Sequence, residues 1–238
     1  MARLPRLSVA GVPHLLVQRA QHQQPVFRDA ADRALFRTLL GEALQAHGVA
    51  LHAYALLDHE LRLLLTPREA TSLSRMVQAL GRRYGSAFNR RHGRTGGLWE
   101  GRFRATLIEP EAHLLDAMRW LEQASEGPPG STSREHHTGE KMDPIVSDHS
   151  HFWSLGNTPF DREMAYRQLL ATPLSPAEVV RLSAAVVKGW PLGSEAFVAG
   201  LSRLTERRLT PLPRGRPPKL VEAENLSPIK RGEEIPGK

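Results

Sequence analysis

The chain has 238 residues, 40% of them hydrophobic, which is enough for one large domain or a domain with a smaller appendage. The absence of cysteine excludes disulfides, thiolate metal sites and thiol nucleophiles. Since no apolar run approaches the roughly 18 residues of a membrane span and the N-terminus lacks a signal-peptide segment, we expect a cytoplasmic protein without a membrane partner. The net charge of +7 favours a nucleic-acid partner, with a merely basic, soluble surface as the alternative.

Segments with the apolar patterns of strands and helices alternate over the first half of the chain. The expected elements are a strand at 9–19, a helix at 29–47, two strands within 51–67, a helix from 71 to about 92, a strand at 99–110 and a helix at 111–123. This order, β-α-β-β-α-β-α, is that of a ferredoxin-like split βαβ unit. We therefore predict an α+β domain, with an antiparallel sheet and helices on one face.

The pattern changes near residue 126. Small residues, prolines and charges without a period predict a flexible loop, and later segments return to helix spacing. The last two helices, at about 175–188 and 194–208, are joined by a turn with glycines, which is also the plan of a helix-turn-helix. The predicted divisions are the α+β domain at 1–125, a linker at 126–150, a helical region at 151–209 and a disordered basic tail at 210–238.

The densest positive cluster lies between residues 82 and 104, where Glu100 is the only acidic residue. Its arginines cannot all find acidic partners nearby, so we predict a phosphate-binding surface. A solvated helix end, where cations suit the helix dipole, is the alternative. Trp99 and Phe103 have the rings to stack on unpaired bases, although core packing is the other use of such residues. The arginines of this cluster are Arg82, Arg83, Arg90, Arg91, Arg94, Arg102 and Arg104.

The C-terminal tail carries a second basic motif, PRGRP, at residues 213–217. It resembles the core of an AT-hook, in which an extended Arg-Gly-Arg strip enters the narrow minor groove of A·T-rich DNA. We expect Arg214 and Arg216 to contact DNA there. The motif is short, and chance matches in basic proline-rich tails are frequent.

The hairpin LHAYALLDHELRLLLTP at residues 51–67 resembles the central hairpin of the REP-associated tyrosine transposases, small single-strand DNA transposases of the HUH class. The segments FNRRHG at 88–93, LWEGRF at 98–103 and LGNTPF at 155–160 also look like this family. The resemblance spans residues 1 to about 219. It implies the HUH transposase fold, often a dimer, with single-stranded or hairpin DNA as the partner. The implied reaction is attack of a tyrosine hydroxyl on a phosphodiester that a divalent metal polarises.

The chain departs from the family at the positions that carry this chemistry. Two histidines hold the family's metal where this chain has Glu60 and Arg62. Trp120 stands at the position of the nucleophilic tyrosine, and the family's following Asn-Pro turn is replaced by Ala124 and Ser125. A cation at a metal position is repulsive at short range, and an indole cannot form the phosphotyrosine ester.

Other residues offer little replacement chemistry. Tyr84 is the nearest tyrosine to the basic cluster, but it lies among apolar neighbours on its helix and we expect it to be packed. Four histidines of the later loop, at 136, 137, 149 and 151, are of a type that binds metals, but no third ligand is evident and a loop favours solvated histidines. We therefore predict no metal site and no cofactor, with Mg²⁺ or Mn²⁺ needed only by an active enzyme.

The sequence therefore predicts a transposase-like protein that binds single-stranded or hairpin DNA without cutting it, in the cytoplasm or on the nucleoid of a bacterium. The resemblance also admits a homodimer. Two alternatives stay open: an active transposase with relocated catalytic residues, and an interaction module, or the product of a decaying gene, that ignores DNA.

Overall fold

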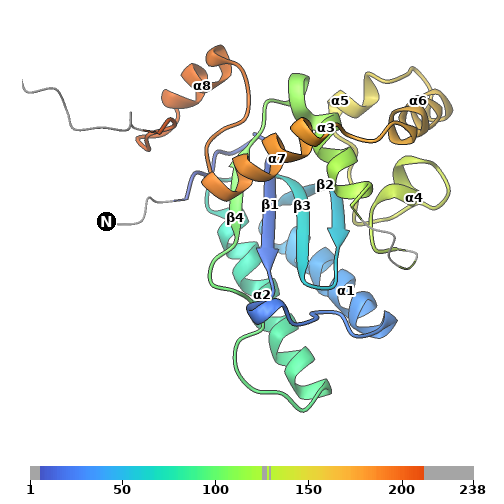
Figure 1. Ribbon diagram of the computed structural model, residues 1–238, viewed down its shortest axis with the longest axis vertical. Coiled ribbons are helices and arrows are strands. Elements are labelled where there is room, and N and C mark those ends of the chain that lie inside the picture. Colours follow the sequence, from blue (N-terminus) through green and yellow to red (C-terminus); the bar gives the residue numbers. More distant parts are fainter. Residues whose placement is uncertain (1–5, 125–127, 129, 212–238) are drawn as a thin grey trace, which may run out of the picture.

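The computed structural model describes residues 6–124, 128 and 130–211. At its centre is one four-stranded antiparallel sheet in the order β2-β3-β1-β4 (Figure 1). The strands are β1 (His14–Arg19), β2 (Val49–Leu56), β3 (Glu60–Pro67) and β4 (Arg104–Leu107). Placing β1 between β3 and β4 is the arrangement of a split βαβ unit, so the predicted α+β class is confirmed.

The helices follow the predicted order. Asp29 caps the first through its side chain, which accepts the backbone N–H of Asp32, and Gly48 ends it with a left-handed φ of 60°. The helices are α1 (Ala30–His47), α2 (Ser72–Arg91), α3 (Pro110–Glu122), α4 (Arg134–His137), α5 (Ser150–Trp153), α6 (Pro159–Ala171), α7 (Pro176–Lys188) and α8 (Glu195–Ser202), with a 3₁₀ turn η1 (Gln21–Gln23).

Helices cover both faces of the sheet, which corrects the expectation that they lie on one face (Figure 1). Leu16 and Leu63 point to the face covered by α1 and α2. Their neighbours Leu15 and Leu64 point to the opposite face, under α3 and α7. Central strands with apolar residues at successive positions bury both faces, as in sheets covered on two sides.

Residues 130–150, expected to be a flexible linker, pack along β2. The backbone N–H of Leu56 donates to the carbonyl of Ser131 at 2.7 Å, and that of Ser147 donates to the carbonyl of Leu51 at 2.7 Å. Ser133 and His137 of this segment are buried. Polar contacts hold the segment rather than a periodic apolar face, and therefore hydrophobic spacing gave no sign of it.

The C-terminal helices belong to two different clusters. Capped by a Ser175–Glu178 capping box, α7 buries Leu182 and Val186 against the sheet, whereas α8 buries Leu201 in a separate cluster with Leu7. The pair therefore differs from a helix-turn-helix, in which the two helices pack on each other. Within the described ranges no single helix is long and apolar enough to cross a membrane; α6 and α7 pass that test only as a pair bent by 102°.

The buried His14 should make stability fall in mild acid. Its Nδ1–H donates to the Val12 carbonyl at 2.7 Å, and Nε2 accepts the Val9 N–H at 3.4 Å. Burial lowers its pKa from 6.5 to about 4. Because the unfolded chain then binds the proton more tightly, this contribution to stability is complete above pH 6.5 and is lost as the pH falls toward 4.

We expect this residue to contribute a slope of about 1.4 kcal/mol per pH unit in that window. The measurement is urea unfolding of the wild type and of His14→Leu at a series of pH values. The variant should be less stable at neutral pH, because Val9 and Val12 lose a partner, yet show the flatter acid slope. Equal slopes would contradict a neutral buried imidazole.

Candidate nucleic-acid interface

A cleft of about 680 Å³ opens between α2, the segment 96–103 and the α1/α2 face of the sheet. Gln18, Leu61 and Leu63 form its floor, and α2 and the 96–103 segment form its walls. Four arginines line it, and none of its lining residues in the described part of the chain is acidic. Such a surface attracts phosphate. The four are Arg6, Arg75, Arg82 and Arg102.

Small residues on α2 allow the 96–103 segment to lie close to the helix. A Cβ atom at Gly81 would contact the Trp99 indole nitrogen at 3.5 Å, and one at Gly85 would meet Leu98 at 3.9 Å. Backbone hydrogen bonds fix the segment to the end of β1: the Glu100 N–H donates to the Arg19 carbonyl at 2.8 Å. The wall of the cleft is therefore anchored at both its helix and its sheet side.

Two buried donors in the cleft lack a partner. The Trp99 indole N–H and the Gln18 side-chain nitrogen are both inaccessible to solvent and make no hydrogen bond with any described residue. A buried donor without an acceptor is costly. An acceptor of a bound molecule, such as a phosphate or base oxygen, would satisfy them.

The cleft has aromatic walls as well as cations. Phe103 is buried, as the core-packing alternative expects, and the Arg6 guanidinium lies 3.9 Å from its ring centre. Trp99 is half-buried and lines the opening. Arg75, Arg82 and Arg102 are exposed, and within the described ranges none of their side chains has a hydrogen bond or an ion pair.

Of the remaining arginines of the predicted cluster, some form ion pairs or hydrogen bonds and others do not. Arg90 is exposed and, among the residues described, unpaired. Arg83 makes an exposed ion pair with Glu42 at 2.6 Å. Part of the cluster therefore has acidic partners, because α1 lies beside α2 and supplies them, whereas Arg82, Arg90 and Arg102 have none among the described residues.

Arg94 and Arg104 are used inside the protein. Arg94 donates to the Gln24 side chain, and its guanidinium lies 5.6 Å from the Phe88 ring centre. Arg104 donates to the Val187 carbonyl at 2.9 Å, on the α3/α7 face of the sheet and away from the cleft. The tail positions 214 and 216 lie outside the described residues.

Arg91 is held by a carboxylate cluster at the start of α1. Its guanidinium donates to both oxygens of Asp29 at 2.7 Å and also contacts Asp32, which His92 contacts at 2.9 Å. The Arg91 hydrogen bonds lower the pKa of Asp29 to about 2. Although burial opposes the change, hydrogen bonds from Arg28, His92 and Arg91 lower the pKa of Asp32. Arg91 is therefore a structural residue that joins α2 to α1.

The positions of the family's catalytic groups meet on the opposite face of the sheet. Glu60 and Arg62 alternate to the same side of β3, and Trp120 of α3 faces them. The Arg62 guanidinium lies 4.1 Å from the Trp120 ring centre and donates to Glu60 at 2.6 Å. Arg19 donates to the second Glu60 oxygen at 3.2 Å. A closed ion pair and a cation–π contact occupy the place where the sequence resemblance puts the family's metal and nucleophile.

The chain has three tyrosines, and all are buried. Their hydroxyls donate to the Asp143 carboxylate, the Val26 carbonyl and the Glu122 carboxylate. Burial, reinforced by nearby carboxylates, raises the pKa of each phenol. The packing predicted for Tyr84 is confirmed, and no tyrosine hydroxyl is available to attack a phosphodiester.

No family model and no curated protein matches the chain. Among solved structures, a REP-associated tyrosine transposase bound to a REP hairpin is similar to it, with 12% identity and a TM-score of 0.46 over 63% of this chain and 96% of that one. A predicted transposase from Deinococcus radiodurans R1 matches with 18% identity and a TM-score of 0.36 over 53% of this chain and 100% of that one. Both are transposases, the class that the sequence motifs resemble.

Removing the Asp32 carboxylate should destabilise the fold. Asp32→Ala leaves the Arg28 N–H and His92 without their acceptor and weakens the tie to Arg91. We expect a loss of about 2–4 kcal/mol in the free energy of unfolding, measured in urea. Glu42→Ala breaks only the exposed pair with Arg83 and should cost less than about 1 kcal/mol. Similar losses in the two variants would contradict a structural role for the Asp32 cluster.

Proposed function

We propose that this chain is a transposase-derived DNA-binding protein that binds single-stranded or hairpin DNA through the arginine cleft and does not cut it. The observation that carries the proposal is the cleft itself, which combines four arginines with unpaired donors and has no acid among its described lining residues. The resemblance of the hairpin and the arginine cluster to the transposase family makes DNA the expected anionic partner. A homodimer, which the same resemblance implies, stays a prediction.

Features of the cleft favour an unpaired strand. Arg75, Arg82 and Arg102 offer forked donors to successive phosphates. Trp99 offers a ring face on which an unstacked base can rest, and its N–H and the Gln18 amide offer donors to base or phosphate oxygens. Bases in a duplex are stacked on each other, so this combination suits single strands and hairpin loops.

The absence of strand cleavage rests on the other face of the sheet. Glu60 has both oxygens engaged by arginines, and Arg62 places a cation at a metal position. With Trp120 beside them and the tyrosines buried, the chain lacks the reacting oxygen of the family's mechanism. The active-enzyme alternative therefore requires a nucleophile of another kind.

Cleft arginines should dominate binding. A labelled DNA hairpin with a single-stranded flank is titrated with protein at several salt concentrations. Arg82→Ala and Arg102→Ala should each weaken binding and lower the slope of log K against log salt by about 0.7–0.9, because one phosphate contact is lost. Arg83→Ala is the matched control: it removes an arginine of α2 that already pairs with Glu42 and does not line the cleft.

A slope that stays at the wild-type value in Arg82→Ala and Arg102→Ala would show that DNA is bound elsewhere. An equal decrease in all three variants, Arg83→Ala included, would show that DNA is bound only through general charge. Wild-type protein that ignores the hairpin at moderate salt would favour the interaction-module alternative.

Strand cleavage is tested on the same DNA. The end-labelled hairpin is incubated with protein and with Mg²⁺, Mn²⁺ or a chelator, and resolved under native and denaturing conditions. We expect a native shift, uncut DNA and no denaturant-resistant adduct in every lane, because no hydroxyl nucleophile of the tyrosine type is accessible. A metal-dependent adduct would overturn the proposed loss of activity, and loss of the adduct in a Tyr84→Phe variant would identify its nucleophile.

A further inference from the structure

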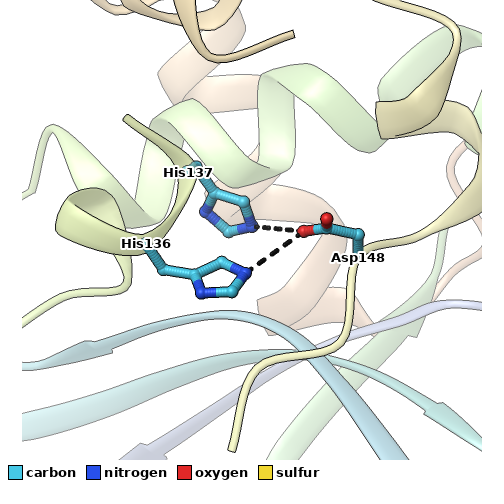
Figure 2. A group of neighbouring side chains, drawn as sticks. All are labelled: His136, His137 and Asp148. Carbon is cyan, nitrogen blue, oxygen red and sulfur yellow. Dashed lines mark hydrogen bonds and ion pairs between the residues drawn. The ribbon is translucent and has the colours of Figure 1, made fainter. Parts of the chain in front are cut away.

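Two histidines and an aspartate meet beside β2, far from the cleft in sequence (Figure 2). His136 and His137 end α4, and Asp148 precedes α5. The Asp148 Oδ1 atom lies 3.3 Å from Nε2 of His136 and 3.8 Å from Nε2 of His137. Ligand atoms about 2.0 Å from a tetrahedral zinc ion lie roughly 3.3 Å from one another. The three side chains therefore have nearly the spacing of a metal site.

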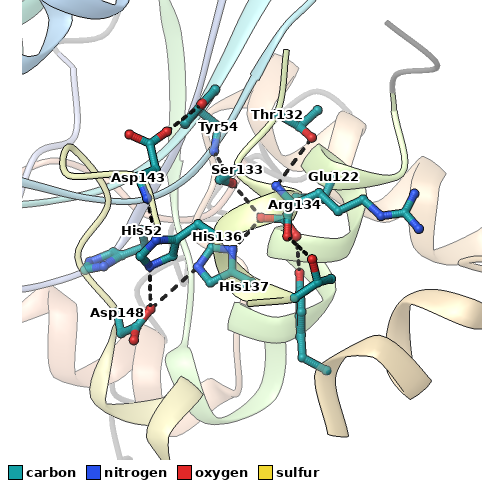
Figure 3. A network of polar contacts seen from close by, with 12 residues as sticks. His52, Tyr54, Glu122, Thr132, Ser133, Arg134, His136, His137, Asp143 and Asp148 are labelled. Carbon is teal, nitrogen blue, oxygen red and sulfur yellow. Dashed lines mark hydrogen bonds and ion pairs between the residues drawn. The ribbon is translucent and has the colours of Figure 1, made fainter. Parts of the chain in front are cut away.

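His137 is oriented as a metal ligand usually is. Its Nδ1 lies 2.6 Å from Oε1 of Glu122, which also accepts the hydroxyl of Ser133 at 2.5 Å (Figure 3). The other Glu122 oxygen accepts the hydroxyl of Tyr166 at 2.8 Å. A carboxylate that takes the Nδ1 proton fixes the imidazole ring and leaves Nε2 to face the site. All of these groups are buried, so the orientation is rigid.

The Nε2 atom of His137 is the second observation that points to a ligand. The side chain has 0% exposure, and the atom makes no hydrogen bond with any described residue. Asp148 Oδ1, at 3.8 Å, is too far to be a hydrogen-bond partner. A buried nitrogen that faces a carboxylate oxygen without a hydrogen bond to it has the surroundings of a cation site.

We propose that His136, His137 and Asp148 bind a divalent transition-metal ion of the Zn²⁺ type, with the fourth position open to water. Two imidazoles and one carboxylate are ligands that suit zinc and its neighbours, whereas Mg²⁺ prefers oxygen ligands and octahedral geometry. The site is separate from Glu60 and Arg62, where the family's metal would lie. It would join α4 to the strand-like segment that ends at Asp148, and so clamp residues 134–148 against β2.

His136 must change tautomer to take part. Its Nδ1 accepts the Asp143 N–H at 3.1 Å, so Nε2 carries the proton when the ring is neutral. A metal on Nε2 moves that proton to Nδ1 and ends this hydrogen bond. The loss of one neutral hydrogen bond weakens binding by roughly five- to tenfold. His137 and Asp148 need no such change, so they are the stronger ligands.

The experiment uses the full-length protein, stripped with a chelator and dialysed. Zn²⁺ is titrated by calorimetry at neutral pH, Co²⁺ is added in parallel to record its visible spectrum, and the thermal midpoint is measured with each metal and with Mg²⁺. We expect one Zn²⁺ to bind per chain. The thermal midpoint should rise with Zn²⁺ and stay unchanged with Mg²⁺, and the Co²⁺ spectrum should show the intense bands of four-coordinate Co²⁺.

The variants are chosen so that the fold survives. His136→Ala and Asp148→Asn change side chains that are partly buried, with 15% and 29% exposure. Each variant should weaken Zn²⁺ binding at least tenfold while its circular dichroism spectrum stays that of the wild type. His59→Asn removes an exposed histidine of the β2–β3 turn and should change nothing. No Zn²⁺ binding by the wild type, or binding that survives both variants, would overturn the proposal.

Discussion

Side-chain alternation along β1 and β3 is the constraint on which the rest of the structure depends. Leu61 and Leu63 point toward α1 and α2, whereas Arg62 and Leu64 point toward α3. A shift of one residue in the β1–β3 register would exchange these sets. The same parity places Gln18 in the floor of the cleft on one face and Arg62 beside Trp120 on the other. The cleft and the cluster of Arg62 and Trp120 are therefore separated by the thickness of the sheet.

Charge is divided by what each helix packs against. The acidic residues of α1 lie beside the C-terminal half of α2, so Arg83 and Arg91 are paired there. The opposite side of α2 faces the 96–103 segment, whose glycines and aromatic rings provide no carboxylate within the cleft. The side chains of Arg75, Arg82 and Arg102 in the cleft have no partner among the described residues. The basic stretch is thus partly a tie between helices and partly a surface for an anion.

Sequence reasoning reached the strand and helix order because the apolar spacing of these elements is strong. It also predicted that Tyr84 is packed, which its burial confirms; that Glu60, Arg62 and Trp120 stand at the family's catalytic positions stays a prediction. It missed the pairing of Arg91, since Asp29 and Asp32 lie about sixty positions earlier and only the α1–α2 contact brings them near. Local spacing carries no information on such contacts.

The segment 130–150 was unpredictable for a different reason. Its burial depends on hydrogen bonds to Glu122 and to the edge of β2, and a periodic apolar pattern is lacking there. The third residue of the proposed metal site is Asp148, which lies eleven residues after His137 in the sequence. The path of the loop places Asp148 beside the two histidines. Composition identified the histidines but not the loop path that gathers them.

The two faces differ in what their polar groups contribute to the fold. On the α3 face, Arg62 is paired with Glu60 and lies over the Trp120 ring, so these three residues form a satisfied, stabilising cluster. On the α2 face, unpaired arginines repel one another and the Trp99 and Gln18 donors are unsatisfied, and both effects oppose folding. In the proposed complex, a bound DNA strand would offset the repulsion between these arginines. Glu60 and Arg62 are thus paired with each other, whereas the cleft holds unpaired arginines and two donors without a partner, and the proposal of DNA binding without strand cleavage rests on this difference.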